Sequence, residues 1–423
     1  LRFPKRVEPT NGGGMTTPLS PPASTDPSDL PVVRLLPKAN ARAIRHGFPW
    51  VYANEMVTDR RTKALTPGSL ALLEDSARQV MGVVAVNPAS KIFCRMLDQN
   101  SEAVVNQSWF EAHIKRAVQL RDQMYDAPFY RLIHAEADGL PGVVIDRFGD
   151  TAVIQANAAW ADVHIDALTA ALVAQTDVRH VLKNAAGRTR SLEGLDDVSG
   201  VLHGDAPGAA VPVPMNGATY MADLTGGQKT GLFYDQRPNH AFAANLSKGK
   251  RVLDVFAHVG GFSLAALANG ASSAVAVDGS APALELAQQG ADAMGVSDRF
   301  ATRQGDAFDI LTALRAEGEE FDVVICDPPA FAPGKPALEA GLRAYERVAR
   351  LAAQLVAENG VLGLCSCSHA ADLTQFRTAS VRGIGRAGRR AALLHTGFAG
   401  PDHPQLPQLA ETGYLKSLFF RLS

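Results

Sequence analysis

The sequence predicts an α/β fold class in which a doubly wound, mostly parallel sheet forms the C-terminal part of the chain. From about Leu246 onward, apolar strands such as RVLDVF, AVAVD and DVVICD alternate with amphipathic helices, which is typical of a parallel sheet covered on both faces. The chain then closes with AALLHTGF and SLFFRLS, two strands without a helix between them. We therefore expect an antiparallel hairpin at the end of this Rossmann-like sheet.

Two smaller units precede the sheet. Residues 31–103 contain short apolar runs such as SLALLED and QVMGVVAV, separated by turn signals, and this pattern predicts a small β-barrel. Residues 104–228 open with the helical pattern SWFEAHIKRAVQLRDQMY and continue with strands, so we expect an α+β central domain. The remaining ranges are 1–30, a tail rich in Pro, Gly, Ser and Thr that we expect to be disordered, and 229–423, the doubly wound domain.

Composition limits the class of protein. The chain has 423 residues, of which 46% are hydrophobic and 20% charged, as in globular proteins with sizeable cores. It contains no run of about 18 apolar residues, so we expect no membrane span. The four cysteines are scattered and form no C-x-x-C pair, and no Cys/His cluster has metal-ligand spacing. We expect a cytoplasmic protein without a metal site.

Two segments carry a local excess of positive charge, although the net charge of the chain is −2. Residues 31–63 contain seven Lys and Arg against two acids, and residues 376–390 contain five arginines and no acid. Such clusters can follow a nucleic-acid backbone, but each could equally be an ordinary solvated face. Whether both segments face one cleft separates the two interpretations.

The predicted strands end in residues that suit a nucleoside ligand. Ligands of open α/β sheets bind beyond the carboxyl ends of the strands. A carboxylate at Asp278 suits the two hydroxyls of a ribose, and Asp306 suits the amine of an adenine or, equally, the N-terminus of a helix. Because the loop AHVGG lacks G-x-G-x-x-G, a cofactor without phosphates fits better than NAD. We therefore predict S-adenosylmethionine, with the candidate residues Asp254, Phe256, Gly260, Gly261, Asp278, Asp306, Asp327 and Pro328.

A cysteine at a strand end suggests the reaction. In LCSCSH, Cys367 falls at the carboxyl end of a strand, beside the predicted position of Asp327. A thiolate that adds to carbon 6 of a cytosine makes carbon 5 nucleophilic enough to accept a methyl group, and an acid such as Asp327 can assist by engaging ring nitrogen 3. The competing interpretation is that Cys367 is a small packing residue, as we expect for Cys326 and Cys94.

The stretches GGQKTGLFYDQRPNH, VLDVFAHVGGFS, FDVVICDPPAF and CSCSH together resemble the bacterial 23S ribosomal RNA cytosine-5 methyltransferases of the large-subunit methyltransferase I type. HAEADGLPGVVIDRFGD and the near-terminal DHP and GYLK resemble the same family, so the resemblance extends from about Val32 to the end. It implies an RNA-binding PUA domain, a central α+β domain and a class I methyltransferase domain. It also implies Cys367 as nucleophile, the aspartates as cofactor and motif residues, and 23S ribosomal RNA as partner. A homodimer is a further assembly to test.

The stretch GGQKTGLFYDQRPNH is not a phosphate-binding loop, because Gln228 separates Gly227 from Lys229 and the first glycine of the motif is missing. It precedes the first strand of the methyltransferase sheet, so we expect it to cross the cofactor pocket. We assign its polar residues to shaping that pocket or contacting RNA phosphates. The alternative is a linker whose Asp–Arg pair caps the next helix. The residues assigned are Lys229, Asp235, Gln236 and Arg237.

Three other functions compete with a cytosine-5 methyltransferase. A purine-directed methyltransferase would leave Cys367 as a packing residue. An RNA-binding assembly factor with a decayed cofactor site draws support only from the unusual loop AHVGG and from Gly290 in the helix after Asp278. A dehydrogenase is compatible with the fold class but lacks the dinucleotide fingerprint.

Overall fold

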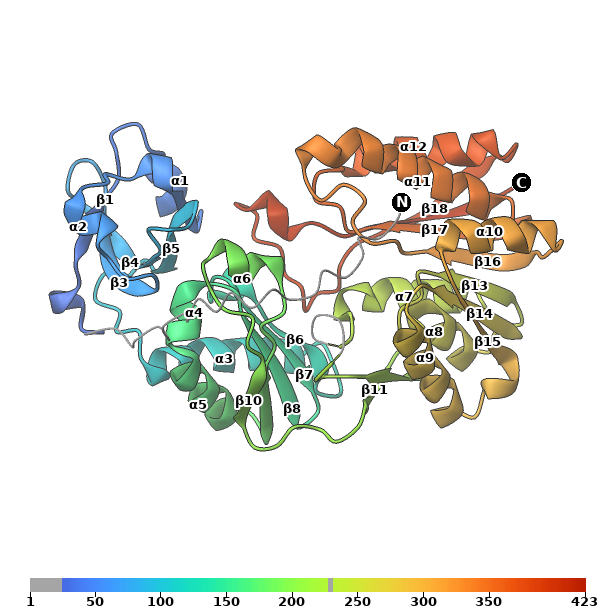
Figure 1. Cartoon of the computed structure of the whole chain (residues 1–423), viewed down its shortest axis with the longest axis horizontal. Coiled ribbons are helices and arrows are strands. Elements are labelled where there is room, and N and C mark those ends of the chain that lie inside the picture. The colour runs from blue at the N-terminus through green and yellow to red at the C-terminus, as the bar shows by residue number, and fades with distance from the viewer. Residues whose placement is uncertain (1–24, 227–230) are drawn as a thin grey trace, which may run out of the picture.

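The computed structural model describes residues 25–226 and 231–423, and these residues form four β-sheets (Figure 1). The first sheet, here called the N-terminal barrel, has the strand order β1-β3-β4-β5-β2. Leu35, which follows the edge strand β1, forms an isolated antiparallel bridge with Met56, which lies just after the other edge strand β2. The sheet therefore closes on itself as predicted. Its elements are β1 (Val32–Arg34), α1 (Ala41–Arg45), β2 (Trp50–Tyr52), α2 (Arg60–Lys63), β3 (Ser69–Glu74), β4 (Val80–Val86) and β5 (Ile92–Asp98).

The second sheet, the central sheet, has the order β10-β9-β8-β7-β6 and packs against helices α3 and α5. Phe110 of α3 and Trp160 of α4 stack inside this core with their rings 5.9 Å apart. The elements are α3 (Gln107–Asp122), β6 (Phe129–His134), β7 (Val143–Phe148), β8 (Thr151–Ala156), α4 (Ala159–Val163), α5 (Ile165–Gln175), β9 (His180–Lys183), α6 (Arg188–Leu192) and β10 (Gly200–His203).

The largest sheet, the C-terminal sheet, has the order β15-β14-β13-β16-β17-β19-β18. The pairs among β15, β14, β13, β16 and β17 are parallel, and β19 runs antiparallel to both β17 and β18. The predicted α/β fold with a terminal antiparallel hairpin is thus confirmed. The strands are β13 (Arg251–Val255), β14 (Ser273–Asp278), β15 (Phe300–Gln304), β16 (Phe321–Cys326), β17 (Val356–Ser366), β18 (Ala391–Gly397) and β19 (Lys416–Leu422).

Helices cover both faces of the C-terminal sheet. One face packs against α8 (Gly261–Ala268) and α9 (Ala281–Ala293), with α7 (Arg237–Asn245) beside α8. The other face packs against α10 (Ala307–Ala316), α11 (Leu338–Ala353) and α12 (Leu373–Arg386). A separate hairpin of β11 (Val211–Met215) and β12 (Ala218–Ala222) packs on α8 and α9 and lies between the central and C-terminal sheets (Figure 1).

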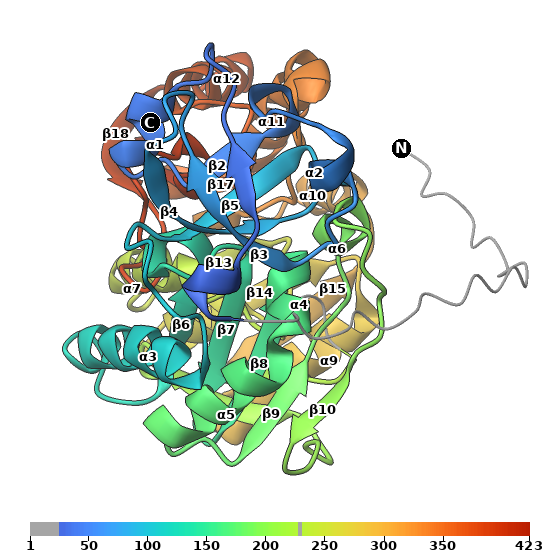
Figure 2. The ribbon, with the colours of Figure 1, turned by 90° about the vertical axis from the view of Figure 1, so that its left-hand side faces the viewer.

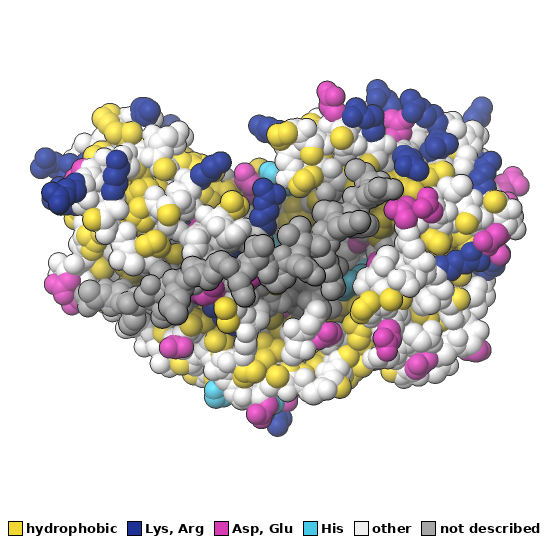
Figure 3. Space-filling view, in the orientation of Figure 1, with side chains coloured by type: hydrophobic (Ala, Val, Ile, Leu, Met, Phe, Trp, Pro, Cys, Tyr) yellow, Lys and Arg dark blue, Asp and Glu magenta, His cyan; other side chains and the backbone are white. Residues whose placement is uncertain are grey.

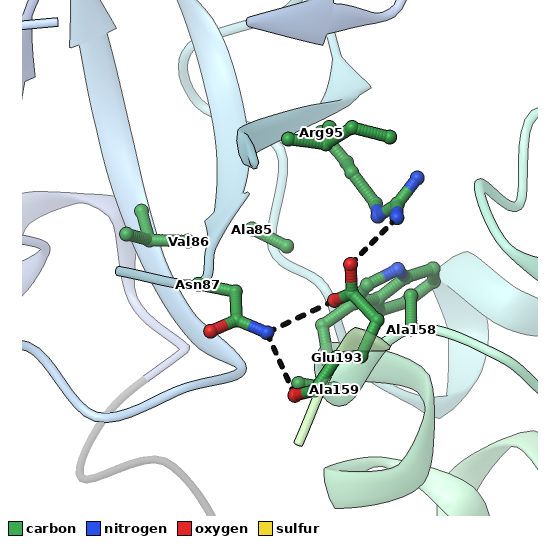
Figure 4. A pocket seen from close by; sticks show the side chains of 9 residues that line it. Ala85, Val86, Asn87, Arg95, Ala158, Ala159 and Glu193 are labelled. Atoms are coloured by element: carbon green, nitrogen blue, oxygen red, sulfur yellow. Dashed lines mark hydrogen bonds and ion pairs between the residues drawn. The ribbon is translucent and has the colours of Figure 1, made fainter. Parts of the chain in front are cut away.

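Buried polar contacts fix the N-terminal barrel to the central sheet. Glu193, directly after α6, accepts hydrogen bonds from Asn87, Ser90 and Arg95 of the barrel (Figure 4). Arg95 also pairs with Glu136, which accepts a hydrogen bond from the indole of Trp50 at 2.8 Å. Since both carboxylates are almost wholly buried, the loss of Arg95 would leave uncompensated charge, so these contacts fix how the barrel is oriented (Figure 2).

Segments from the chain's end attach the C-terminal sheet to the central sheet. Asp402 is fully buried, and one of its carboxylate oxygens accepts the backbone N–H of Arg131 in β6 at 3.1 Å. Arg121 of α3 donates to the Asp402 carbonyl and forms a two-pronged ion pair with Asp138. Tyr234 adds a 2.8 Å hydrogen bond to the Arg147 carbonyl of β7. Asp402 of the DHP motif therefore connects the two sheets through hydrogen bonds.

Candidate active site

The predicted site residues gather at one edge of the C-terminal sheet. Strand β13 lies between β14 and β16, and β16 pairs with β17, all in parallel. The carboxyl ends of these strands carry Asp254 in β13, Asp278 at the end of β14, Asp327 directly after β16 and Cys367 directly after β17. The residues predicted from strand ends thus lie together at the edge of the sheet where open α/β sheets bind ligands.

The loop after β13 has an unusual backbone. Phe256 and His258 both adopt positive φ angles, 64° and 50°, which side-chain-bearing residues rarely do. Asp278 holds the loop, since its Oδ2 accepts the His258 N–H and its Oδ1 accepts the Ser280 N–H, each at 2.8 Å. The Phe256 ring meets Phe331, just beyond the DPP motif, edge to face at 6.3 Å. Strain of this kind is maintained where a loop must keep one shape to bind a ligand.

Asp254 is fully buried beneath this loop. Its Oδ2 accepts the N–H groups of Phe262 and Ser263 in the first turn of α8, at 3.2 and 2.8 Å. Its Oδ1 is buried and has no hydrogen-bond partner within the described residues. Burial raises the pKa of this carboxyl to about 6, against the hydrogen bonds from Ser263 and Phe262 that lower it. A buried unpartnered oxygen here suits a polar group of a ligand.

The two glycines of AHVGG have packing reasons to be glycine. Gly260 has φ +82°, and a Cβ on Gly261 would stand 2.7 Å from Nε2 of the His240 ring. Close approach of the backbone to a ligand is therefore not needed to explain either residue. His240 is itself buried, and burial lowers its pKa to about 3, so this histidine is neutral.

Asp306 is exposed and caps α10, its Oδ1 accepting the N–H groups of Phe308 and Asp309 at 2.9 and 3.2 Å. The alternative role predicted for Asp306, capping the N-terminus of a helix, is therefore observed. These hydrogen bonds use only one oxygen of its carboxylate. Pro328 is buried next to Asp327, where it stiffens the turn after β16.

Asp327 is held by the stretch GGQKTGLFYDQRPNH. Gln236 Nε2 donates to Asp327 Oδ2 at 2.9 Å, and Gln236 Oε1 accepts from Asn239 Nδ2 at 2.7 Å. Asn239 donates in turn to the Phe398 carbonyl at 3.1 Å. The amide of Gln236 is therefore oriented from both sides, and it aims an N–H at the carboxylate.

Asp235 and Arg237, two further residues assigned in this stretch, point into the protein. Asp235 is buried, with Oδ2 accepting the Tyr414 hydroxyl at 2.7 Å. The Arg237 guanidinium lies over the Tyr125 and Tyr234 rings, 4.1 and 5.4 Å from their centres, and donates to the Phe129 carbonyl. No side-chain hydrogen bond caps α7, so the alternative in which an Asp–Arg pair caps this helix is wrong. Lys229 lies outside the described residues.

Cys367 differs from the other three cysteines. It is partly exposed, whereas Cys94, Cys326 and Cys365 are buried and burial raises the pKa of each of those thiols. The packing role predicted for Cys94 and Cys326 is confirmed by their complete burial. Cys367 alone among the cysteines is open to a substrate.

Three hydroxyls that the sequence pattern did not single out hold the segment around Cys367. Ser366 donates to the Tyr345 hydroxyl at 2.8 Å, and the Tyr345 and Ser368 hydroxyls are 2.7 Å apart. Ser368 also accepts the Ala332 N–H at 2.9 Å, which ties this segment to the loop that begins with Asp327. The alternation of serine and cysteine in CSCSH is visible in the sequence, but Tyr345 sits in the middle of α11 and carries no motif signal.

Comparisons with known proteins assign the family. A family model described as S-adenosylmethionine-dependent methyltransferase matches residues 137–421, and one described as a PUA-like domain matches residues 33–99. The Ribosomal RNA large subunit methyltransferase I of Photobacterium profundum is 34% identical over 385 residues, covering 90% of this chain and 97% of the relative. This chain belongs to the ribosomal RNA large subunit methyltransferase family. The Deinococcus radiodurans Ribosomal RNA large subunit methyltransferase is 32% identical over 413 residues, covering 94% and 100% of the two chains.

Solved structures agree on the fold of the methyltransferase. A candidate S-adenosylmethionine-dependent methyltransferase from Streptococcus mutans superposes with a TM-score of 0.77 at 20% identity, covering 93% of this chain and all of the other. A similar structure, with the same TM-score and identity, is a methyltransferase complexed with SAH and covers 92% and 99% of the two chains. The predicted PUA-like barrel and methyltransferase fold are both confirmed.

S-adenosylmethionine is therefore the cofactor of the methyltransferase, and the residues present fit it. Asp278 keeps lone pairs on both carboxylate oxygens for hydroxyls of a ribose, and Asp254 Oδ1 is a buried acceptor without a donor among the described residues. Within the described residues, no helix is long and apolar enough to cross a membrane, and no group of His, Cys, Asp and Glu could hold a metal ion.

Proposed function

We propose that this methyltransferase transfers a methyl group to carbon 5 of a cytosine in 23S ribosomal RNA, with Cys367 as the nucleophile. One observation carries the proposal. The partly exposed Cys367 comes directly after β17, Asp327 comes directly after β16, and these two strands pair with each other. The thiol and the carboxylate are thus at neighbouring strand ends, with the segment around Cys367 tied to the DPP loop through Ser368 and Ala332.

The chemistry needs both groups. The Cys367 thiolate adds to carbon 6 of the cytosine: a sulfur–carbon bond forms, the 5,6 double bond breaks, and its electron pair is shared by carbon 5 and ring nitrogen 3. In its protonated form Asp327, oriented by Gln236, donates a hydrogen bond to ring nitrogen 3 and so stabilises the negative charge that develops there. When bound, S-adenosylmethionine supplies an electrophilic methyl group. Carbon 5 takes this methyl group, a base then removes the carbon-5 proton, and the double bond re-forms as the carbon–sulfur bond breaks and the thiolate leaves.

The distribution of positive charge supports an RNA substrate. Lys and Arg side chains gather on the N-terminal barrel and over α11 and α12, and the surface is hollowed between these two parts (Figure 3). Arg377, Arg382 and Arg386 are all exposed on α12, whose opposite face buries Phe376 and Ile384. The two basic segments thus flank one hollow, the arrangement that favours a phosphate backbone over an ordinary solvated face.

Two measurements test the proposal. Ribosomal RNA is mapped by mass spectrometry in cells with and without this protein. Cells without the protein should lack one 5-methylcytosine of the 23S RNA and no modification of the other ribosomal RNAs. A methylated purine that disappears instead would favour the purine-directed alternative. Cys367→Ala should abolish turnover while calorimetry still shows S-adenosylmethionine binding. Retained turnover in that variant would exclude the thiol mechanism, and absent cofactor binding in the wild type would favour the assembly factor.

A further inference from the structure

Lys416, in the GYLK motif, is a buried cation at the first position of β19. Its side chain is almost inaccessible, and its Nζ donates to the Ser368 and Ala371 carbonyls at 2.8 and 2.7 Å. Among the described residues, Lys416 forms no ion pair with a carboxylate; its hydrogen bonds go to these two carbonyls. Burying an ammonium group without an anion is costly, so such a lysine calls for a negatively charged partner.

The charged groups that act on Lys416 are Cys367 and Asp372. Asp372 is exposed and is already engaged as the N-terminal cap of α12, where its Oδ1 accepts the Gln375 N–H at 2.8 Å. Cys367, by contrast, directly precedes Ser368, whose carbonyl accepts a hydrogen bond from the ammonium. Burial lowers the pKa of Lys416, and a negative charge on Cys367 opposes that decrease.

The register of the sheet keeps the two groups together. Ser366 pairs with Lys416 across β17 and β19, so Cys367 leaves the ladder one residue past that pair. The Lys416 ammonium donates hydrogen bonds to the carbonyls of Ser368 and Ala371, which belong to the segment directly after Cys367. A strand pair and two hydrogen bonds therefore fix the ammonium in relation to the backbone on both sides of Cys367.

The Asp327 carboxyl stands at the strand end next to that of Cys367, and two phenols near Cys367 are neutral. They are Tyr345 of α11 and Tyr414, one residue before Leu415; burial raises the pKa of both phenols, and a negative charge on Cys367 raises each further. Tyr345 is engaged with Ser366 and Ser368, and Tyr414 donates to Asp235. Neither phenol can balance a thiolate charge, whereas the Lys416 ammonium can.

We propose that Lys416 is the electrostatic partner of Cys367 and keeps that thiol in its nucleophilic, thiolate form. The inference deepens the proposed function and rests on it for its biological meaning. Lys416 touches neither the base nor the cofactor in the proposed reaction; it is a positioning residue that acts through Cys367. The proton released on ionisation passes to solvent, because Cys367 is partly exposed. A lysine placed in this way explains how a cysteine can be reactive at neutral pH.

The test measures the thiol directly and does not depend on turnover. The full-length protein is treated with iodoacetamide across pH 5 to 10, and alkylation of Cys367 is followed by peptide mass spectrometry, with the buried Cys94, Cys326 and Cys365 as internal references. In Lys416→Met the midpoint of the rate profile should move upward by about one to three pH units, so alkylation at pH 7 should fall about tenfold or more.

Matched variants separate charge from anchoring. Lys416→Gln keeps N–H donors for the two carbonyls but removes the charge, and should shift the profile as Lys416→Met does. Lys416→Arg should restore a low midpoint. Lys335→Met removes an exposed charge in the loop beyond the DPP motif and should leave the profile unchanged. If Lys416→Met proves too unstable to purify, Lys416→Gln alone decides the question.

An unshifted midpoint in Lys416→Gln would overturn the proposal, since the lysine would then serve only to anchor the segment. The two proposals fail in different ways. If the Cys367→Ala variant still methylates RNA, the thiol mechanism is excluded, whatever the alkylation profile of the Lys416 variants. If Cys367→Ala is inactive but the alkylation profile of Lys416→Gln is unshifted, only the role of Lys416 is excluded.

Discussion

Gln236 Nε2 donates a hydrogen bond to Asp327 Oδ2 over 2.9 Å, joining two residues that are 91 positions apart in the sequence. Gln236 is buried, and its carbonyl oxygen is held by Asn239, so its amide has one orientation. Through this contact the DQRPN segment holds the Asp327 side chain, which the proposed mechanism uses to bind the base.

Gln236→Met should lower kcat for RNA methylation by about a hundredfold. Without the hydrogen bond from Gln236, the Asp327 carboxyl group can rotate and is no longer held in the orientation that binds ring nitrogen 3. Methionine has a similar volume and no donor. Cofactor affinity, measured by calorimetry, should change little. The control is Gln288→Met, which removes a partly exposed glutamine of α9 that donates a hydrogen bond to Asp292. An unchanged kcat in Gln236→Met would show that Asp327 needs no such support.

Asp254 should make stability depend on pH. Its pKa is raised in the folded protein to about 6 from an ordinary value of 3.8, so the folded state binds the proton more tightly than the unfolded state. The free energy of unfolding should therefore decrease as pH rises from about 4 to about 6, by about 3 kcal/mol. Asp254→Asn keeps an acceptor for the α8 N–H groups and cannot ionise, so urea unfolding should show a flatter profile for the variant. Identical slopes would contradict the assignment.

Arg237→Ala should affect stability rather than RNA binding. The guanidinium lies over Tyr125 and Tyr234 and bonds the Phe129 carbonyl, so its loss should cost about 1–3 kcal/mol in urea unfolding. Arg179→Ala, which removes an exposed arginine beside Asp150, is the control. Should RNA affinity instead fall with a reduced salt dependence while stability is kept, Arg237 contacts a phosphate and its buried contacts are secondary.

The arginines of α12 should contact the RNA backbone. Replacing both Arg377 and Arg382 by Ala should weaken binding to RNA of any sequence and reduce the slope of log affinity against log salt by about 1 for each lost phosphate contact. Arg303→Ala removes an arginine paired with Glu317 at the other end of the C-terminal sheet and should have no such effect. Equal slopes for wild type and the double variant would place the RNA elsewhere.

The fold could be predicted because its determinants are local. Alternation of apolar strands with amphipathic helices indicates a parallel sheet, and each strand end then fixes a position such as Asp278 or Asp327 at a common edge. Glycine proved harder to interpret. Gly261 is a candidate cofactor residue by its place in the loop AHVGG, but a Cβ there would meet the His240 ring, and a contact between residues 21 positions apart leaves no local pattern.

The supporting residues of the site could not be predicted for the same reason. Tyr345 reaches Ser366 and Ser368 from the middle of a helix, and its helical spacing is that of any core aromatic. Lys416 has the sequence context of an ordinary strand-end lysine, and only its burial against the segment after Cys367 reveals that it lacks a carboxylate partner within the described residues. Contacts that depend on tertiary packing are invisible to periodicity.

The central claim, a covalent bond between Cys367 and a cytosine, is tested most directly with RNA in which 5-fluorocytidine replaces cytidine. Fluorine cannot leave carbon 5 as a proton does, so the adduct should persist. With S-adenosylmethionine present, the wild-type protein should form a denaturation-resistant complex whose cross-linked peptide contains Cys367, and Cys367→Ala should form none. A complex that forms without Cys367, or methylation of ordinary RNA with no trapped complex, would contradict the thiol mechanism.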